Sequence, residues 1–374
     1  MKNIEDLENL NQKKILLRLD LNVPLNNRNI TDTTRIDKIL STLNFLIKKN
    51  CKIIIISHIG RPEGKINKKL SMKPVCDYLE KKIEKKIRLI KENIYSVNPE
   101  LILENSKEQI IVLENIRFYE QEEKNDEKFA QLLSKFGDIY VNEAFSCSHR
   151  NHASVTKITK FLPSYCGLQM NLEINALKKV TSDIKRPITC IIGGSKISTK
   201  IKIIKNLIPK FENIIIVGGM ANNILKYKGY KVGKSIYEKN CEMIIDEIFS
   251  LSNQYGCKII YPKDVSIGKN IEDNAKIKNL SEICDDDFIL DIGPKTLEMI
   301  KSVIESSKTV LWNGPAGYFE NKNFASGSIE IAKKIMSIKE NIFSVAGGGD
   351  TIAVLNLSKT FNHFNFVSTA GGAF

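Results

Sequence analysis

Several signatures of common protein classes are missing from this chain of 374 residues. No apolar run approaches the ~18 residues that a membrane-spanning helix needs. The opening stretch, MKNIEDLENLNQKK, is charged and has no apolar centre, so we expect no secretory signal and a cytoplasmic protein. The eight cysteines stand singly, with no CxxC pair and no metal-type spacing to the four histidines. We therefore expect reduced, mostly buried thiols.

Other absences narrow the function. No GxGxxG follows a predicted strand, which weighs against a dinucleotide-dependent dehydrogenase. The segment 229–235, GYKVGKS, resembles a P-loop, but it has three residues between its glycines instead of four, so we interpret it as a loop. The formal net charge is +13, yet no basic run is interleaved with aromatic residues. We expect at most weak, non-specific binding to nucleic acid.

Arginine is scarce and unevenly placed. The chain has 48 lysines but eight arginines, all in its first half: Arg18, Arg28, Arg35, Arg61, Arg88, Arg117, Arg150 and Arg186. Several of them end predicted strands or lie in the loops that follow. A guanidinium grips carboxylate or phosphate through paired N–H groups, which an ammonium group cannot do. The first half is therefore predicted to hold a small polyanion.

Apolar, β-branched runs alternate with helical patterns along the whole chain. In the first half we predict strands at Ile15–Leu19, Lys52–Ser57, Arg88–Ile90, Ile110–Glu114 and Asp138–Asn142. In the second half we predict strands at Ile188–Ile192, Asn213–Val217, Lys258–Tyr261, Phe288–Ile292, Thr309–Trp312, Ile342–Val345 and Phe364–Ser368. Thr33–Lys49 has helical spacing, with Asp32 as the expected N-cap.

This alternation predicts an α/β fold of βαβ units with mostly parallel sheets. One sheet of that many strands is improbable, so we predict two doubly wound, Rossmann-like domains of three layers, αβα. The expected domains are residues 1–167 and 181–374, joined by a hinge helix at 168–180. An ordinary surface helix remains the alternative for that segment.

Ligands of doubly wound sheets bind beyond the carboxyl ends of the strands, where this chain places its polar loops. The stretch SVAGGGDTI, 344–352, runs from a predicted strand through glycines into a helix. Such a turn suits phosphate, and Asp350 could hold a phosphate-bridging Mg²⁺. The alternative is a tight strand–helix turn in which Asp350 or Thr351 caps the helix.

The loop motifs, in order, are RLDLNVP, SHIGRP, NEAFSCSHR, GGSKISTK, DIGPKT, WNGPAGYFE and AGGGDT. Together they resemble the phosphoglycerate kinase family over nearly the whole chain. The resemblance implies reversible phosphoryl transfer between 1,3-bisphosphoglycerate and ADP, giving 3-phosphoglycerate and ATP, with Mg²⁺. It also implies a monomer in which transfer occurs in line after the domains close.

The resemblance implies a glycerate site in the first half, formed by Asp20, Leu21, Asn22, Arg35, His58, Ile59, Gly60, Arg61, Arg117 and Arg150. Arg18 is expected to support Asp20. For His58 the alternative is a strand-end histidine whose ring bonds to backbone.

For the nucleotide, the resemblance implies Gly194, Lys196, Lys200, Gly293, Asn313, Pro315, Glu320, Gly348, Gly349, Asp350 and Thr351, with Asp350 at the metal. Lys196 and Lys200 are four apart, so on a helix starting after Gly194 they would share a face. Two solvated lysines are the alternative. Arg35, Lys200 and Lys196 are the expected catalytic residues, because they would stabilise the transferring phosphoryl group.

The chain departs from the family pattern in four places. Glu143 and Thr199 stand where aspartate is usual, and Ala370 replaces a glycine of the last loop. Glu143 is expected to lengthen a side chain near the glycerate site. The sequence stops at Phe374, where the family usually continues, so we expect nucleotide binding with reduced turnover. Two other function classes stay open at this point: a nucleotide-dependent dehydrogenase and a non-enzymatic, two-lobed anion-binding protein.

Overall fold

The computed structural model describes residues 2–26, 29–368 and 370. Arg28 and most of the last loop therefore lie outside the described residues. The chain divides into two compact units between Asn175 and Ala176, within helix α6 (Leu168–Thr181). We call them the N-terminal and the C-terminal unit. Among the described residues, no helix combines the length and the apolar character needed to cross a bilayer.

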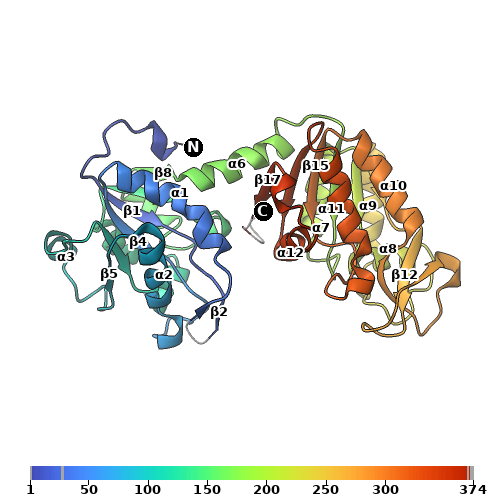
Figure 1. Cartoon of the computed structure of the whole chain (residues 1–374), viewed down its shortest axis with the longest axis horizontal. Helices are drawn as coiled ribbons and strands as arrows, with labels where there is room; N and C mark the ends of the chain where they lie inside the picture. The colour runs from blue at the N-terminus through green and yellow to red at the C-terminus, as the bar shows by residue number, and fades with distance from the viewer. Residues whose placement is uncertain (1, 27–28, 369, 371–374) are drawn as a thin grey trace. The chain divides into compact units, whose positions relative to one another are not determined.

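A six-stranded parallel sheet forms the centre of the N-terminal unit, in the order β5-β6-β4-β1-β7-β8 (Figure 1). Its strands are β1 (Lys14–Arg18), β4 (Lys52–Ile56), β5 (Ile87–Ile90), β6 (Ile110–Leu113), β7 (Ile139–Asn142) and β8 (Ser164–Cys166). Its helices are α1 (Thr34–Lys48), α2 (Lys73–Ile83), α3 (Pro99–Glu104), α4 (Glu120–Glu123) and α5 (Glu127–Ser134). A short hairpin joins β2 (Leu25–Asn26) to β3 (Asn29–Ile30).

Both faces of this sheet are buried, because successive side chains of a strand point to opposite faces. In β4, Ile53 and Ile55 pack with the apolar sides of α1 and α2. Ile54 and Ile56 lie on the other face, in the cluster that contains Phe129 of α5. Continuous apolar strands of this kind are typical of parallel sheets covered by helices on both sides.

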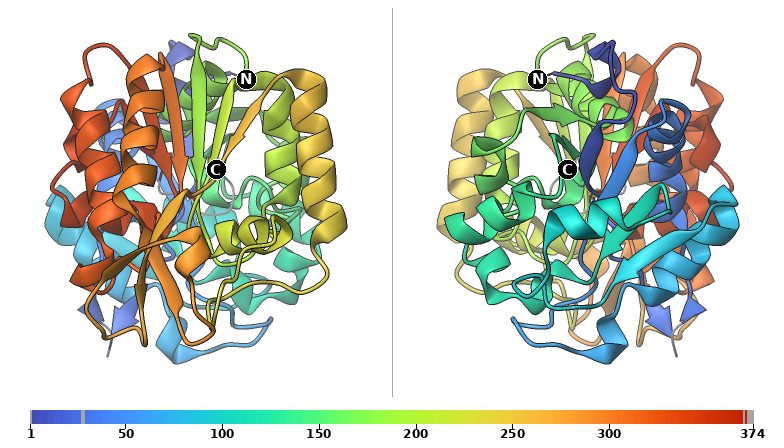
Figure 2. Two further views of the ribbon diagram at one scale, coloured as in Figure 1. Left: turned by 90° about the vertical axis from the view of Figure 1, so that its right-hand side faces the viewer. Right: turned by 90° about the vertical axis from the view of Figure 1, so that its left-hand side faces the viewer.

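The C-terminal unit repeats this plan with a second parallel sheet, in the order β11-β10-β9-β15-β16-β17. The strands are β9 (Ile188–Ile192), β10 (Asn213–Ile216), β11 (Lys258–Ile260), β15 (Thr309–Asn313), β16 (Phe343–Gly347) and β17 (Phe366–Ser368). The helices are α7 (Ile201–Leu207), α8 (Gly219–Tyr227), α9 (Glu242–Tyr255), α10 (Pro294–Ser306), α11 (Ser326–Ser337) and α12 (Gly349–Leu357). The left view of Figure 2 shows α9 on one side of this sheet and α10 and α11 on the other. The expected α/β fold with two parallel sheets is therefore confirmed.

Trp312, the single tryptophan of the chain, lies fully buried in β15 within the core beneath α10 and α11. Its indole Nε1 donates to the carbonyl oxygen of Gly314 at 2.7 Å. The indole thus joins the core of the C-terminal unit to the turn that follows β15.

Some elements were not predicted. A small antiparallel sheet pairs β12 (Asp264–Gly268) with β13 (Lys276–Asn279) and with β14 (Phe288–Ile292). Of these three strands only β14 was predicted, because the mostly exposed KIKN of β13 lacks an apolar run and the short DVSIG of β12 has just two large apolar residues, Val265 and Ile267. The short β8 was also not predicted. In addition, α1 begins at Thr34, so Asp32 lies one residue before the N-cap position and accepts the Thr34 N–H at 2.9 Å.

The expectation about cysteines is confirmed: all eight are free thiols, and all except Cys284 are buried. The segment at 229–235 is a loop, as expected, with a single bridge from Gly233 to Phe288.

The longer side chain of Glu143 has a structural role. Its carboxylate turns to the start of α6, where it accepts the N–H groups of Gln169 at 2.8 Å and Met170 at 3.2 Å. The Thr42 hydroxyl also donates to it. Gly167 gives it room, because a Cβ there would lie 1.9 Å from Glu143 Oε2. The longer side chain therefore caps a helix instead of reaching toward a ligand.

Candidate functional sites

In the N-terminal unit, the motif loops meet at the carboxyl edge of the sheet because β6, β4, β1 and β7 are neighbours in it. Arg35 and Asp20 form an ion pair there, with 2.7 Å between Arg35 Nη1 and Asp20 Oδ2. The same nitrogen donates to the carbonyl oxygen of Asn22 at 3.2 Å. The Gly60 N–H donates to Asn22 Oδ1 at 2.8 Å, whereas the Asn22 side-chain nitrogen donates to no described residue and can donate to a ligand.

His58 is buried beside Arg18, whose Nη2 lies 3.1 Å from His58 Nδ1. A guanidinium can only donate, so Nδ1 is the acceptor and the proton of the neutral ring is on Nε2. Burial, together with the nearby Arg18 and Arg117, lowers the pKa of His58 well below its usual value. The ring is therefore a neutral donor at physiological pH, and its bond goes to a side chain instead of to backbone.

Three further arginines offer donors at this edge. Arg117 is buried, and its Nη1 donates to the carbonyl oxygen of Gly60 at 3.0 Å. Its Nε and Nη2 have no hydrogen-bond partner among the described residues, although Nε lies 3.4 Å from Glu123 Oε1. Exposed Arg61 and half-buried Arg150 form no ion pair with any described side chain. Unpartnered, partly buried guanidinium donors suit an anionic ligand.

Leu21 and Ile59, also expected at this site, have side chains in the hydrophobic core. Only their backbone is available to a ligand, and the Leu21 N–H already donates to the Ser57 hydroxyl at 3.0 Å. Gly60 adopts a φ of 64°, in the left-handed region. These three residues shape the loops that carry the charged groups.

Sequence reasoning missed several residues that support this site. The Ser146 hydroxyl donates to Asp20, and the Ser154 hydroxyl accepts Arg18 Nε at 3.0 Å. Ser154 in turn donates to the buried carboxylate of Glu122 at 2.6 Å. The position of Ser146 inside the motif NEAFSCSHR was the one available signal, since Glu122 lies outside every motif.

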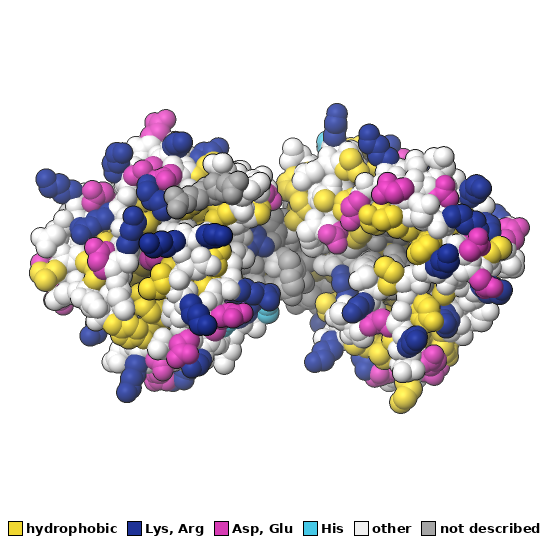
Figure 3. All heavy atoms as spheres, turned by 90° about the horizontal axis from the view of Figure 1, so that it is seen from below, with side chains coloured by type: hydrophobic (Ala, Val, Ile, Leu, Met, Phe, Trp, Pro, Cys, Tyr) yellow, Lys and Arg dark blue, Asp and Glu magenta, His cyan; other side chains and the backbone are white. Residues whose placement is uncertain are grey.

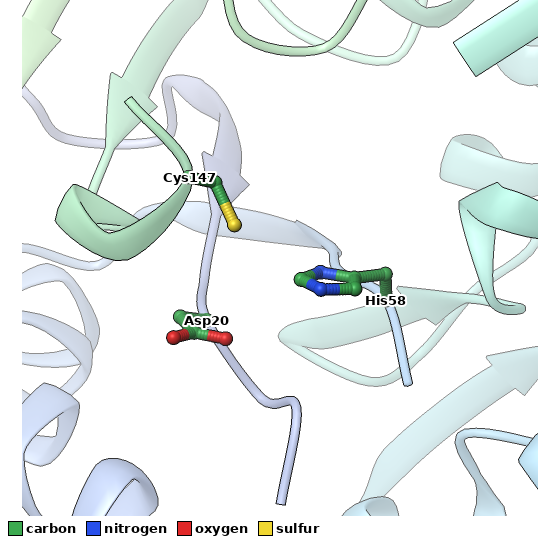
Figure 4. Close-up of side chains that lie close together, drawn as sticks. All are labelled: Asp20, His58 and Cys147. Carbon is green, nitrogen blue, oxygen red and sulfur yellow. The ribbon is translucent and has the colours of Figure 1, made fainter. Parts of the chain in front are cut away.

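Asp20, His58 and Cys147 point toward one another (Figure 4), and their ligand atoms lie within 4.8 Å of one another. This donor set could hold a metal ion in isolation. However, Arg18 Nη2 lies 4.0 Å from Cys147 Sγ, and Arg35 is paired with Asp20. The surrounding guanidinium groups repel a cation, so the cluster belongs to the anion site.

In the C-terminal unit, glycine turns follow the neighbouring strands β10, β9, β15 and β16. The turns after β9 and β15 touch through their backbones. A Cβ on Gly193 would lie 2.2 Å from the Pro315 carbonyl oxygen, so only glycine fits there. The Gly218 N–H donates to the carbonyl oxygen of Ala316 at 3.1 Å.

These turns border a pocket of about 330 Å³. Its apolar walls include Phe288, Leu290 and Phe319. Among the expected nucleotide residues, it is lined by Gly194, Pro315, Glu320 and Asp350. A pocket with apolar walls and a few polar groups at one end suits a base attached to a charged group.

Lys200 lies beside this pocket, and its ammonium group donates to the Asn313 side chain. Burial lowers the pKa of Lys200. The expected helical pair with Lys196 is wrong, because α7 begins only at Ile201. Ser198 donates to Glu238 through its N–H at 2.9 Å and its hydroxyl at 2.6 Å, which holds the segment in a turn. Lys196 is exposed on that turn.

The glycine turn at 347–349 opens α12. Gly348 has a φ of 96° and lies at the N-cap, and a Cβ on Gly349 would meet nothing within 4 Å. Exposed Asp350 has no hydrogen bond or ion pair among the described residues. Thr351 is buried instead, and its hydroxyl accepts the Gly314 N–H at 2.7 Å. The N-terminus of α12 thus has open space, free N–H groups and one free carboxylate.

Local packing and hydrogen bonds explain Gly293, which was expected at the nucleotide site, and Thr199 and Ala370, which depart from the family pattern. Gly293 lies against Asp264, whose carboxylate carbon would be 2.3 Å from a Cβ at that position. The Thr199 hydroxyl closes its turn by donating to the Lys196 carbonyl oxygen at 2.8 Å. Ala370 is buried, and its N–H donates to the Ser368 hydroxyl at 3.2 Å.

Comparisons with known proteins agree with one another. The family model for "Phosphoglycerate kinase" matches residues 4–374. A phosphoglycerate kinase of Wolbachia sp. subsp. Drosophila simulans is 43% identical over 378 aligned residues, covering 100% of this chain and 95% of the relative. That of Rhizobium meliloti is 38% identical, covering 100% of this chain and 94% of the relative.

Solved structures are similar as well. The phosphoglycerate kinase of Coxiella burnetii aligns with a TM-score of 0.90 and 32% identity, over 99% of this chain and 94% of that one. The enzyme of Pyrococcus horikoshii aligns with a TM-score of 0.83 and 26% identity, over 100% of this chain and 94% of that one.

Proposed function

This chain belongs to the phosphoglycerate kinase family, and from that premise we propose how its residues share the reaction. The enzyme catalyses phosphoryl transfer between 1,3-bisphosphoglycerate and ADP, a step of glycolysis. The proposal concerns which residues bind each substrate, which stabilise the transferring group and where Mg²⁺ is held.

The glycerate substrate binds at the carboxyl edge of the N-terminal sheet. Asn22 and neutral His58 donate hydrogen bonds, while Arg61, Arg117 and Arg150 hold the carboxylate and phosphate groups. The observation that carries this assignment is the buried Arg117: its Nη2 has no hydrogen-bond partner among the described residues, and its Nε has only the ion pair with Glu123 at 3.4 Å. Leaving such donors unmatched is costly, so an anion is their natural complement.

The nucleotide binds in the pocket of the C-terminal unit. The apolar walls take the base, Glu320 takes ribose hydroxyls, and the N–H groups at the start of α12 take the phosphates. Asp350 would hold Mg²⁺. The residues fit this ion, because a free, exposed carboxylate beside an open phosphate cradle provides the hard oxygen ligand that Mg²⁺ prefers. When bound, the ion neutralises charge on the phosphate oxygens.

The chemistry needs no general base. An oxygen of the terminal ADP phosphate forms a bond to the acyl phosphorus as the bond to the carboxyl oxygen breaks, and the acceptor oxygen is already ionised. Catalysis is then positioning and charge stabilisation of an in-line transfer. Arg35 from one unit and Lys200 from the other stabilise the transferring group, with Lys196 as a second cation. Because they belong to different units, closure of the domains, at a hinge in 168–180, must precede transfer.

A coupled assay of ATP formation from 1,3-bisphosphoglycerate and ADP, with and without Mg²⁺, tests this proposal. We expect turnover that requires Mg²⁺ and no absorbance change with NAD. Because the chain belongs to this family, we no longer consider the two other function classes, a nucleotide-dependent dehydrogenase and a non-enzymatic anion-binding protein. We also propose that the enzyme is monomeric and cytoplasmic and binds nucleic acid only weakly. Light scattering of the purified protein tests whether it is a monomer.

A further inference from the structure

A second pocket of the N-terminal unit lies outside every residue assigned to the glycerate site. Its volume is about 600 Å³, within the range of small-molecule sites. It lies at the carboxyl ends of β5 and β6, beside the start of α2 and the 3₁₀ turn η3 (Ile116–Phe118). We call it the lysine pocket; it is lined by Ile66, Lys68, Lys69, Ser71, Lys73, Pro74, Asp77, Lys91, Asn93, Glu114, Phe118 and Tyr119.

The lysine pocket is positively charged. Lys68, Lys69 and Lys91 are exposed and form no ion pair with any described side chain. The fourth lysine, Lys73, pairs with Asp77 on the same face of α2. Three cations around one cavity therefore have no ion-pair partner among the described residues.

The lining has four lysines against two carboxylates, so the charge of Glu114 reduces the positive charge of the pocket without cancelling it. The Glu114 carboxylate also has a structural role. It accepts the Ser71 hydroxyl at 2.6 Å, the Met72 N–H at 2.6 Å and the Asn115 N–H at 2.9 Å. These bonds hold the loop before α2 against the end of β6. Glu114 is thus a structural part of the pocket floor.

The walls of the lysine pocket are apolar and rigid. Phe118 is buried, and the Tyr119 hydroxyl accepts the Ile94 N–H at 3.0 Å, which fixes that ring. Pro74 and Ile66 complete the apolar surface, and Ile66 is 79% exposed. On the face seen in Figure 3, the N-terminal unit, on the left, exposes hydrophobic side chains among Lys and Arg. An exposed apolar surface of this kind, next to unpaired cations, is typical of a ligand site.

We propose that the lysine pocket binds a small anion that carries an aromatic ring, with its phosphate or carboxylate on the lysines and its ring against Phe118, Tyr119 and Ile66. The site is separate from the substrate site, yet it adjoins it through η3. Phe118 lines the pocket, whereas the preceding residue, Arg117, reaches the carbonyl oxygen of Gly60. Asn115 ties the same turn to the carbonyl oxygens of Ile59 at 2.8 Å and Leu70 at 2.9 Å.

Phenyl phosphate is the probe, and saturation-transfer NMR on its ring protons is the measurement. The full-length protein is kept in saturating 3-phosphoglycerate and ADP, so that the glycerate site and the nucleotide pocket, which also suits a ring with a phosphate, are both occupied. We expect phenyl phosphate to bind under these conditions, and more tightly than inorganic phosphate. Displacement of the probe by 3-phosphoglycerate, or no binding at all, overturns the proposal.

Two double variants with the same change in charge complete the test. Lys69→Glu/Lys91→Glu should weaken binding of phenyl phosphate by about tenfold or more. Lys81→Glu/Lys85→Glu, in the last turn of α2 and just after its end, lies outside the pocket and should leave binding of phenyl phosphate unchanged. Equal weakening in both would mean general attraction to a basic surface and would overturn the proposal. Ile66→Ser should weaken the binding of phenyl phosphate but not that of inorganic phosphate. If the ratio of the two affinities is unchanged, the proposed contact between the aromatic ring and the apolar wall is wrong.

Discussion

At the scale of single residues, the few arginines and the many lysines of this chain have different roles. Lysine supplies most of the surface charge, whereas Arg18 and Arg117 are buried at the carboxyl edge of the N-terminal sheet. Arg18 bonds to Ser154 and contacts His58, so it orients groups that touch the ligand. The planar fork allows one side chain to hold several partners in fixed directions.

Arg35 provides the sharpest test at this scale. Arg35→Lys keeps the charge but loses the fork, so we expect kcat to fall on the order of 10³-fold while the KM for ADP changes little. Steady-state kinetics with both substrates measures this. Arg88→Lys, on β5 and away from both proposed sites, is the matched control. Unchanged turnover in Arg35→Lys would remove this residue from the mechanism.

His152 should make stability depend on pH. It is 8% exposed, and burial together with Arg117 lowers its pKa to about 4. Between about pH 6.5 and pH 4, His152 is therefore protonated in the unfolded chain but neutral in the folded protein. The free energy of unfolding falls as the pH falls through this range. His152→Gln should reduce the stability lost between pH 7 and pH 5 by roughly 1–2 kcal/mol. Urea unfolding at the two pH values measures this, and an identical loss in both proteins contradicts it.

At the scale of elements, the start of α12 is the clearest phosphate cradle. Gly349→Ala should fold normally, because the added methyl group meets nothing within 4 Å. The same methyl group would occupy space that a phosphate needs, so we expect the KM for ADP to rise about tenfold. Thermal unfolding without ligand serves as the control. A normal KM would place the phosphates elsewhere.

Helices, strands and loops differ in how well the sequence predicted them. The buried strands and the motif loops were found because apolar runs and turn residues are local signals. The helix start at Ile201 was misplaced because Glu238, 40 residues after Ser198, holds that segment in a turn. The cap that Glu143 provides could not be predicted for the same reason: its partners Thr42 and Met170 are distant in the sequence. Glu122 and Ser154 carry no pattern at all, since they act only through Arg18.

At the scale of the whole molecule, each unit has its own hydrophobic core on both faces of its own sheet. We therefore expect calorimetry to resolve two transitions. A ligand at 100 times its Kd stabilises the unit that binds it by about 2.7 kcal/mol. ADP should raise the transition of the C-terminal unit, and 3-phosphoglycerate that of the N-terminal unit. A single transition that moves with both ligands would contradict this expectation.

The single tryptophan, Trp312, is an intrinsic fluorophore in the C-terminal unit. It is hydrogen-bonded to the carbonyl oxygen of Gly314, in the turn that follows β15. Light that excites tryptophan but not tyrosine will report the C-terminal unit alone. Quenching or a spectral shift of this fluorescence on adding ADP can be followed by stopped-flow without any label. Events confined to the N-terminal unit will leave the tryptophan fluorescence unchanged.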